Sequence, residues 1–363
     1  DDKFGVVLSI VGFNHQTKSL IINCTGQLEI QHNIYRISLE DESHQLLGNE
    51  KGCHEASISK DGSLIVDSWS AFDVPKQVDL VNTTTNEITT LHVSPSPYKG
   101  YQLPEMKFGK LTANDEKETT LYYRLIKPTN FDENQKYPCI VYVYGGPHVR
   151  LITNEWFYTA VGWQIYMAQL GYVVFVLDGR GSDQRGYEFE SVIYKHLGKY
   201  EKEDQMTGVK FLKSLSYVDP DRIGVMGWSY GGFMATNLML SYPEVFKVGV
   251  AGGPVINWAY YEIMYGERYM STPQDNPEGY RENNMCFRAS NLKGRLMIIF
   301  GYNDDVCVPQ HSLSFIQACE NAMTFPDLMI YPNEKHGIRG PKAVHLYSTI
   351  SRYFEDHLKP LKK

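Results

Sequence analysis

Short runs in which hydrophobic and polar residues alternate fill the first part of the chain, and polar turn signals at residues 14–18 and 60–62 separate them. The alternation predicts β-strands at residues 6–11, 19–23, 34–39, 56–59, 64–68, 77–81 and 88–91. We expect four strands followed by four more, repeating at roughly 40–45 residues, which is the spacing of β-propeller blades. Two blades cannot close a ring. Either further blades precede residue 1 in the natural protein, or this segment is a small β-sandwich.

The pattern changes after a proline-broken connector at residues 94–97. Beyond it, apolar runs alternate with helical periodicity, which indicates an α/β domain with a mostly parallel, doubly wound sheet covered by helices on both faces. The sequence therefore predicts two domains, residues 1–95 and 96–363. The predicted strands are 139–144, 172–177, 223–226, 248–251, 296–300 and 328–331. The predicted helices are 156–169, 203–214, 233–241, 310–321 and 343–358.

Composition limits the classes of function. The net charge of −7 argues against a nucleic acid or an anionic membrane surface as partner. No apolar run approaches the roughly 18–20 residues that span a bilayer. The cysteines form no C-x-x-C pair and no metal-ligand spacing with histidine, so we expect buried free thiols and leave one disulfide open. The chain begins without a signal peptide and runs straight into strand-like sequence, which is typical of an internal segment.

The clearest chemical motif is Gly227-Trp228-Ser229-Tyr230-Gly231. It matches the nucleophile elbow G-x-S-x-G and lies between a predicted strand and a predicted helix, as that motif requires. The serine occupies a strained turn there, and small neighbours let the backbone pass close to itself. We therefore expect Ser229 to be a catalytic nucleophile, and the domain to have the α/β-hydrolase fold.

A serine hydroxyl needs a histidine base oriented by a carboxylate, and in this fold the order along the chain is serine, acid, histidine. Asp304 and Asp305 follow one predicted strand, and His336 follows the next. Both loops belong at the carboxyl edge of the sheet, where active sites lie. Spacing alone does not choose between the two aspartates. His311 and His345 are competing bases, but both lie within predicted helices.

The oxyanion of a tetrahedral intermediate needs hydrogen-bond donors. One is expected from the backbone N–H of Tyr230, the residue after the nucleophile. The second is expected from the loop at residues 144–147, either from the Tyr144 hydroxyl or from a glycine N–H.

With these residues in place, the chain resembles the prolyl oligopeptidase family of serine peptidases, and most closely its dipeptidyl peptidase IV branch. The resemblance rests on the motifs at residues 227–232, 144–147, 178–181 and 203–205 and on the tract 258–270. It covers essentially the whole chain, as the last part of a propeller followed by the hydrolase domain.

The resemblance implies that Asp304 is the triad acid and that the Tyr144 hydroxyl is the second oxyanion donor. It also implies a pocket for proline. A proline ring has no N–H, so a close-fitting aromatic box selects it by shape. The residues that match this pocket are Tyr230, Val255, Trp258, Tyr261 and Tyr265.

The resemblance further implies cleavage after proline by an Xaa-Pro dipeptidyl aminopeptidase, with no metal or cofactor. In that branch a pair of glutamates upstream of residue 1 holds the substrate amino group, and Val306 stands where an asparagine is usual. A prolyl tripeptidyl aminopeptidase or another proline-specific aminopeptidase therefore stays open. An acylaminoacyl peptidase and an esterase on the same fold are further alternatives, and a non-catalytic binding protein is the distant one. The expected partners are peptides with proline near the N-terminus. Homodimer formation is left open, and the expected location is extracytoplasmic, with the cytoplasm as the alternative.

Overall fold

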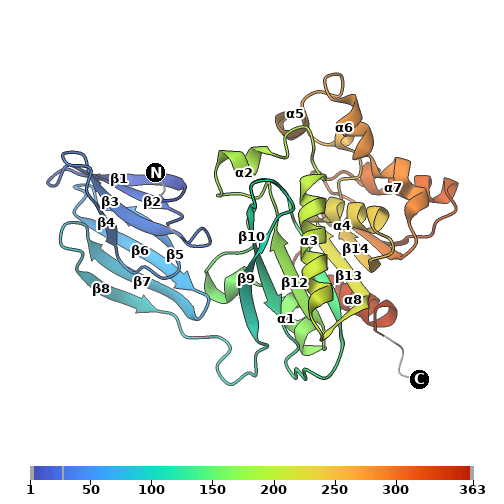
Figure 1. The fold of residues 1–363 in the computed structure, drawn as a ribbon, viewed down its shortest axis with the longest axis horizontal. Coiled ribbons are helices and arrows are strands. Elements are labelled where there is room, and N and C mark those ends of the chain that lie inside the picture. The colour runs from blue at the N-terminus through green and yellow to red at the C-terminus, as the bar shows by residue number, and fades with distance from the viewer. Residues whose placement is uncertain (1–3, 27, 360–363) are drawn as a thin grey trace. The chain divides into compact units, whose positions relative to one another are not determined.

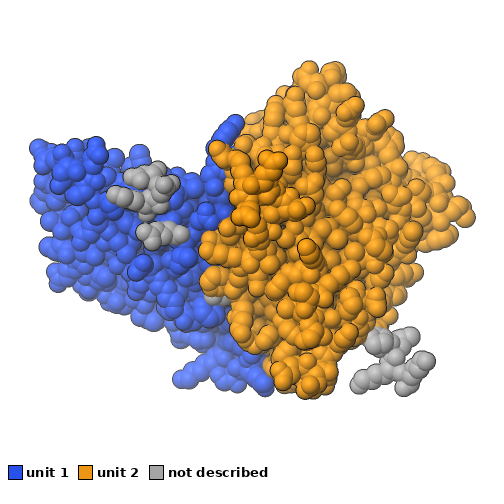
Figure 2. All heavy atoms as spheres, in the orientation of Figure 1, with its two compact units in different colours: residues 1–103, 150–161, 183–187 blue, residues 104–149, 162–182, 188–363 orange. Residues whose placement is uncertain are grey.

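The computed structural model describes residues 4–26 and 28–359. The chain divides into two compact units, coloured separately in Figure 2. Unit 1 comprises Asp1–Leu103, Arg150–Val161 and Asp183–Tyr187, and unit 2 comprises Pro104–Val149, Gly162–Ser182 and Glu188–Lys363. The domain boundary expected between residues 95 and 96 stays a prediction. Two short segments that follow it in the sequence, residues 150–161 and 183–187, belong to unit 1.

Unit 1 contains two antiparallel sheets of four strands, in the orders β1-β2-β3-β4 and β5-β6-β7-β8. Their bounds are β1 (Val7–Asn14), β2 (Ser19–Cys24), β3 (Asn33–Ser38), β4 (His44–Leu47), β5 (Cys53–Ile58), β6 (Leu64–Ala71), β7 (Val74–Asn82) and β8 (Ile88–Val93). The two sets of four strands that the sequence predicts are thus confirmed. The alternation located seven of the strands, and it missed β4 because this strand has only four residues and two of them are polar.

The two sheets of unit 1 share one apolar core. Five completely buried residues from both sheets form it, with β-branched residues at four positions: Ile21, Ile34, Leu47, Ile65 and Val81. Each of the five comes from a different strand, β2, β3, β4, β6 and β7.

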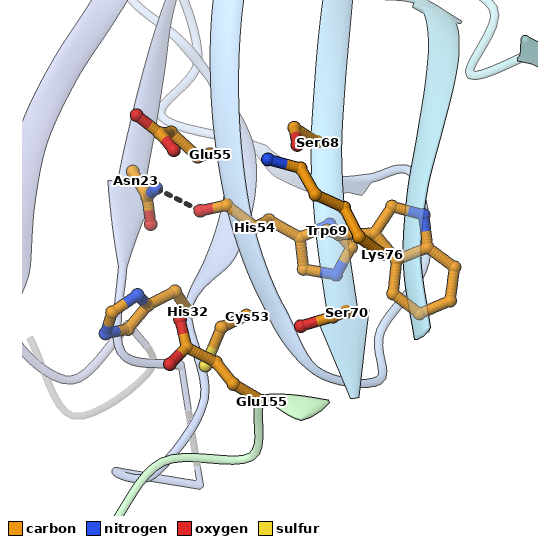
Figure 3. A pocket seen from close by; sticks show the side chains of 10 residues that line it. All are labelled: Asn23, His32, Cys53, His54, Glu55, Ser68, Trp69, Ser70, Lys76 and Glu155. Carbon is orange, nitrogen blue, oxygen red and sulfur yellow. Dashed lines mark hydrogen bonds between the residues drawn. The ribbon is translucent and has the colours of Figure 1, made fainter. Parts of the chain in front are cut away.

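A polar hollow of about 280 Å³ adjoins strand β5 in unit 1 (Figure 3). His54, in its wall, is buried, and its Nδ1 lies 2.7 Å from the Asp67 carboxylate. The imidazole stacks on the Trp69 ring at 5.3 Å, and its Nε2 lies 3.2 Å from the carbonyl oxygen of Lys51. Both ring nitrogens of His54 are therefore engaged, so this histidine joins β5 to β6 and has a structural role.

Unit 2 is built on one eight-stranded sheet, with the order β16-β15-β14-β13-β11-β12-β10-β9 (Figure 1). The bounds are β9 (Met106–Thr112), β10 (Thr120–Ile126), β11 (Tyr137–Tyr142), β12 (Val173–Asp178), β13 (Val218–Trp228), β14 (Phe246–Gly252), β15 (Arg295–Gly301) and β16 (Asp327–Tyr331). Strands β11 to β16 are parallel, as predicted. The sequence did not predict β9 and β10, which pair antiparallel at one edge.

Helices cover both faces of this sheet. Gly224 of β13 faces Phe354 of α8 (Pro341–His357). The next residue of β13, Val225, pairs with Gly249 of β14, and Gly249 faces Met239 of α4 (Tyr230–Ser241). Because neighbouring strand residues point to opposite faces, α8 and α4 cover different faces. The doubly wound α/β-hydrolase fold is confirmed. The helices are η1 (Trp156–Thr159), α1 (Gly162–Gln169), α2 (Tyr187–Ser191), α3 (Tyr200–Ser214), α4 (Tyr230–Ser241), η2 (Trp258–Tyr260), α5 (Ile263–Met270), α6 (Pro277–Glu282), η3 (Met285–Asn291), α7 (Pro309–Asn321) and α8 (Pro341–His357).

One predicted helix, at residues 156–169, is correct only from residue 162 onwards. Residues 156–169 form a single 3₁₀ turn, η1, and then a separate helix, α1. Phe157 and Thr159 have φ angles of 55° and 60°, which a continuous right-handed helix does not allow. Helical periodicity across this segment concealed the break. Among the described residues, no helix has the length and apolar character needed to cross a membrane.

Candidate active site

Ser229 lies on a sharp turn between β13 and α4. Its φ and ψ are 60° and −119°, and its N–H donates to the carbonyl oxygen of Gly252 at 2.8 Å. A Cβ added to Gly227 would lie 2.1 Å from the carbonyl oxygen of Gly231, and one added to Gly231 would lie 2.3 Å from that of Val143. Only glycine fits at these positions, so the sequence folds into the elbow geometry that the motif predicts.

Asp304 follows β15 and is almost completely buried. Its Oδ1 accepts hydrogen bonds from the backbone N–H groups of Val306 and Cys307, at 2.9 and 2.8 Å. Its Oδ2 lies 2.8 Å from Nδ1 of His336. Asp305 points elsewhere and pairs with the exposed Lys335. Of the two aspartates that spacing could not separate, the structure brings Asp304 to the histidine.

His336 lies in the loop after β16 and reaches the turn that carries Ser229. Its carbonyl oxygen accepts a hydrogen bond from Nε1 of Trp228, the residue before the serine, at 3.0 Å. A Cβ added to Gly253, which follows the Gly252 that bonds to Ser229, would lie 3.2 Å from two atoms of the imidazole. Residues that are far apart in sequence therefore meet at the carboxyl edge of the sheet.

The two competing histidines have other partners. His311 is completely buried in α7, and its Nδ1 accepts a hydrogen bond from the N–H of Ile256 at 3.1 Å. Burial lowers the pKa of His311 to about 4, while the charge of Asp304 opposes that shift. His345 lies in α8, where its Nδ1 is 2.9 Å from the Tyr331 hydroxyl. Neither imidazole belongs to the arrangement around Ser229.

Tyr230 follows the serine directly in the chain, and Tyr144 packs on Tyr230. Tyr230 is the first residue of α4, so its N–H has no acceptor within the helix. The rings of Tyr144 and Tyr230 lie 5.9 Å apart. Burial raises the pKa of the Tyr144 phenol, which stays a hydrogen-bond donor at neutral pH, and no hydrogen bond within the described part of the chain engages its hydroxyl.

The aromatic cluster formed by Tyr230, Trp258, Tyr261 and Tyr265 is compact. Trp258 stacks on Tyr265 with ring centroids 5.8 Å apart and 7° between the planes, and Tyr261 meets Trp258 edge-on at 5.6 Å. Tyr230 lies 5.5 Å from Trp258. Val255 is buried in the same hydrophobic core. The structure therefore brings together the four aromatic residues that the resemblance implies for the pocket.

A model of the prolyl oligopeptidase family matches residues 159–361, more than half of the chain. The chain belongs to the prolyl oligopeptidase family. A model of the dipeptidyl peptidase IV N-terminal region also matches residues 3–76, in unit 1. This pair of matches agrees with the order of the two parts predicted from the sequence.

Several members of the family and solved structures are similar to the chain. Human dipeptidyl peptidase 8 is 30% identical over 350 residues, which cover 92% of this chain and 38% of that protein. Human prolyl endopeptidase FAP is 35% identical over 261 residues, covering 71% of this chain and 34% of that protein. A candidate dipeptidyl aminopeptidase IV from Bacteroides ovatus is 48% identical with a TM-score of 0.92, covering 97% of this chain and 50% of that chain. The chain thus spans between a third and half of these relatives.

Two buried groups near Ser229 were not predicted from the sequence. Glu201, in α3, is completely buried, and its Oε1 accepts a hydrogen bond from the Tyr230 hydroxyl at 2.5 Å. Cys307 is also buried, and its thiol forms a side-chain hydrogen bond with Ser229. Glu201 lies in the charged run Tyr200-Glu201-Lys202-Glu203, which is typical of a solvated helix. The sequence signal for a buried carboxylate was its position in the first turn of the helix, where it can accept from a free backbone N–H such as that of Gly198, three residues earlier.

Val306, at the position where the resemblance implies an asparagine, lies two residues after Asp304. Its backbone N–H donates to Asp304, while its side chain is 44% exposed. A valine side chain has no donor for a substrate carbonyl. Any such contact would have to come from another residue.

Proposed function

We propose that this protein is a serine peptidase that removes Xaa-Pro dipeptides from the N-termini of peptides. The observation that carries the proposal is the aromatic cluster next to the elbow. Tyr230 directly follows Ser229 in the chain and is also one wall of that cluster. A residue bound against these rings therefore presents its carbonyl group to the serine. Family membership supports the same chemistry.

The proposed reaction is acyl transfer through Ser229. His336 accepts the proton of the serine hydroxyl as Oγ attacks the carbonyl carbon of the residue before the cut. The same imidazole then gives this proton to the departing amine. Asp304 orients the ring through Nδ1 and stabilises the imidazolium that forms. Water, deprotonated by His336, then hydrolyses the acyl-enzyme. No metal or cofactor takes part in these steps.

The oxyanion that forms in each step needs donors preorganised for it. We assign this role to the N–H of Tyr230 and to the hydroxyl of Tyr144. The high pKa of the Tyr144 phenol keeps its proton in place at neutral pH. Its hydroxyl has no hydrogen bond to another described group, so binding an oxyanion breaks no existing bond.

Selectivity for proline follows from the shape of the site. The parallel rings of Trp258 and Tyr265 and the perpendicular ring of Tyr261 form flat apolar walls. A proline ring offers a small apolar face and no N–H, so such walls discriminate by fit. A missing or additional methylene group changes the free energy of binding in such a pocket by about 1–3 kcal/mol.

The dipeptide length of the product rests on the relatives. The solved structure of Porphyromonas gingivalis dipeptidyl peptidase 4 is 28% identical, with a TM-score of 0.91 over 98% of this chain and 50% of that chain. Val306 favours a second candidate, a prolyl tripeptidyl aminopeptidase, because it removes one donor expected for dipeptide substrates. An extracytoplasmic location and peptides with proline near the N-terminus complete the proposal.

A kinetic comparison in the full-length protein tests the proposal. Gly-Pro, Gly-Ala and Gly-Gly-Pro substrates with a chromogenic leaving group are assayed with free and with blocked amino groups. Free Gly-Pro is expected to give the highest kcat/KM, with no activity in Ser229→Ala. Preference for Gly-Gly-Pro would support the tripeptidyl candidate, and a requirement for the block would indicate an acylaminoacyl peptidase. Absence of turnover, together with no labelling of Ser229 by a fluorophosphonate probe, would overturn the proposed enzymatic function and indicate a binding protein.

A further inference from the structure

Glu201 is a completely buried carboxyl group that contacts both segments of the proposed oxyanion site. Its Oε1 accepts from the Tyr230 hydroxyl at 2.5 Å, and its Oε2 accepts from the N–H of Gly198 at 3.0 Å. A Cβ added to Gly145, next to Tyr144, would lie 3.7 Å from the Cβ of Glu201. The carboxyl group therefore lies where the loop after β11 and the start of α4 meet.

The phenol of Tyr230 connects this carboxyl group to the reaction centre. The backbone of Tyr230 supplies the proposed oxyanion donor, and its ring packs on Trp258 and Tyr144. A Cβ added to Gly146 would lie 2.5 Å from that ring, so the ring is held tightly by the loop as well. Because the hydroxyl at the far end of the ring is also fixed, the side chain has little freedom to rotate. This restricts the backbone of Tyr230 as well.

We propose that Glu201 is a positioning residue: in its carboxylate form it holds Tyr230 so that the N–H and the aromatic wall face the acyl group on Ser229. This inference rests on the proposed function. Glu201 does not touch the substrate, and it acts only through Tyr230. Its protonation state then sets how well the oxyanion site is formed.

The two protonation states of Glu201 differ in hydrogen bonding. The carboxylate accepts both of its bonds. Oε2 of Glu201 faces an N–H that can only donate, whereas Oε1 faces a hydroxyl that can also accept, so a proton on this carboxyl group lies on Oε1 and is donated to the oxygen of Tyr230. The Tyr230 proton then loses the acceptor that it has in the present structure, although the phenol is buried. Protonation of Glu201 therefore breaks the present arrangement.

This change falls near neutral pH. Burial raises the pKa of Glu201 to about 7, although the bonds from Tyr230 and Gly198 partly oppose the shift and the charge of Asp204 adds to it. A carboxyl group near its midpoint at neutral pH occupies both forms there, so activity responds to small changes in pH.

The other charged and titratable neighbours do not replace Glu201 in this role. Asp204, on the same helix, is held by Arg180 through three hydrogen bonds to its guanidinium group. Lys202 neighbours Glu201 in sequence, and burial lowers its pKa. Tyr144 packs on the Tyr230 ring, and Tyr265 stacks on Trp258, which also contacts Tyr230. Burial raises the pKa of each of these two phenols, so both stay neutral.

The test measures how fast a fluorophosphonate probe labels Ser229 in the full-length protein as pH changes. The labelling rate of the wild type is expected to fall as Glu201 is protonated, so this ionisation should appear in the acidic limb of the rate profile. Glu201→Gln should lack this ionisation and should label more slowly at alkaline pH, by up to about 100-fold. Glu203→Gln, a partly exposed neighbour on the same helix, is the matched control and should keep the wild-type profile.

Infrared spectroscopy provides a readout that does not depend on activity. The carbonyl band of a protonated carboxylic acid should titrate near neutral pH in the wild type and be absent from Glu201→Gln. If the wild type labels and Glu201→Gln keeps the same rate and the same ionisation near neutral pH, the inference is wrong. A wild type that never labels contradicts the proposed function instead. Should Glu201→Gln fail to fold, Tyr230→Phe decides: it removes the donor, and an infrared midpoint unchanged from wild type overturns the inference.

Discussion

Nδ1 of His336 lies 2.8 Å from Oδ2 of Asp304, and the other oxygen of that carboxylate accepts two backbone N–H groups. The carboxylate is buried and anchored on one side, so it presents a fixed acceptor to the imidazole on the other. This anchoring determines the tautomer of His336 that serves as a base, with Nε2 free of its proton.

Exchanging each of the paired aspartates for asparagine separates their roles. Asp304→Asn should lower kcat by about 10⁴-fold, because an amide favours the wrong tautomer of His336 and does not stabilise the imidazolium that forms during the reaction. Asp305→Asn removes only an exposed pair with Lys335 and should leave kcat within about twofold. Steady-state kinetics on Gly-Pro-p-nitroanilide measure both. A larger loss for Asp305→Asn would reassign the acid.

The aromatic cluster is tested by removing one wall. Tyr261→Ala should reduce kcat/KM for a Gly-Pro substrate by roughly 10- to 100-fold and affect a Gly-Ala substrate less, because the smaller side chain depends less on the wall. Tyr260→Ala is the control, since Tyr260 is 42% exposed and lies outside the cluster. Equal losses on both substrates would show that Tyr261 supports folding rather than recognition of proline.

Cys307 is expected to be chemically inert in the native protein. Burial raises the pKa of its thiol to about 12, and the charge of Asp304 adds to this shift, so the reactive thiolate is scarce at neutral pH. Iodoacetamide should modify the partly exposed Cys286 before Cys307, as followed by peptide mass mapping. Denatured protein, in which all cysteines react, is the control. Rapid modification of native Cys307 would contradict its burial.

Residues whose environment is local were predictable from the sequence. The elbow at Ser229 is encoded in adjacent glycines, and the six parallel strands appear as apolar runs because both faces of each strand are covered. Strand β9 was not predicted, since most of its residues are exposed at the edge of the sheet. The choice of Asp304 over Asp305 and the burial of Glu201 both depend on contacts with distant segments. Neighbouring residues in sequence do not encode such contacts.

The pH dependence of stability tests the structural role of His311. Its pKa of about 4 in the folded protein lies below its ordinary value of 6.5. Between about pH 4 and pH 6.5 this imidazole therefore binds a proton in the unfolded chain but not in the folded protein. The stabilisation is fully present above pH 6.5 and is lost as pH falls towards 4. The expected decrease in the free energy of unfolding is on the order of 3 kcal/mol.

Denaturant unfolding of the wild type and of His311→Asn, over this window of pH, isolates the effect. The asparagine carbonyl can accept from the N–H of Ile256 but does not titrate, so the wild type should lose more stability than the variant as pH falls. Glu201 acts in the opposite direction: its raised pKa makes the free energy of unfolding fall as pH rises from 4.5 to about 7. Because this contribution is common to both proteins, it cancels in their difference. His345→Asn, at an exposed position, should keep the wild-type slope. If His311→Asn also keeps that slope, the imidazole is protonated in the folded protein and its hydrogen bond with Ile256 is wrongly assigned.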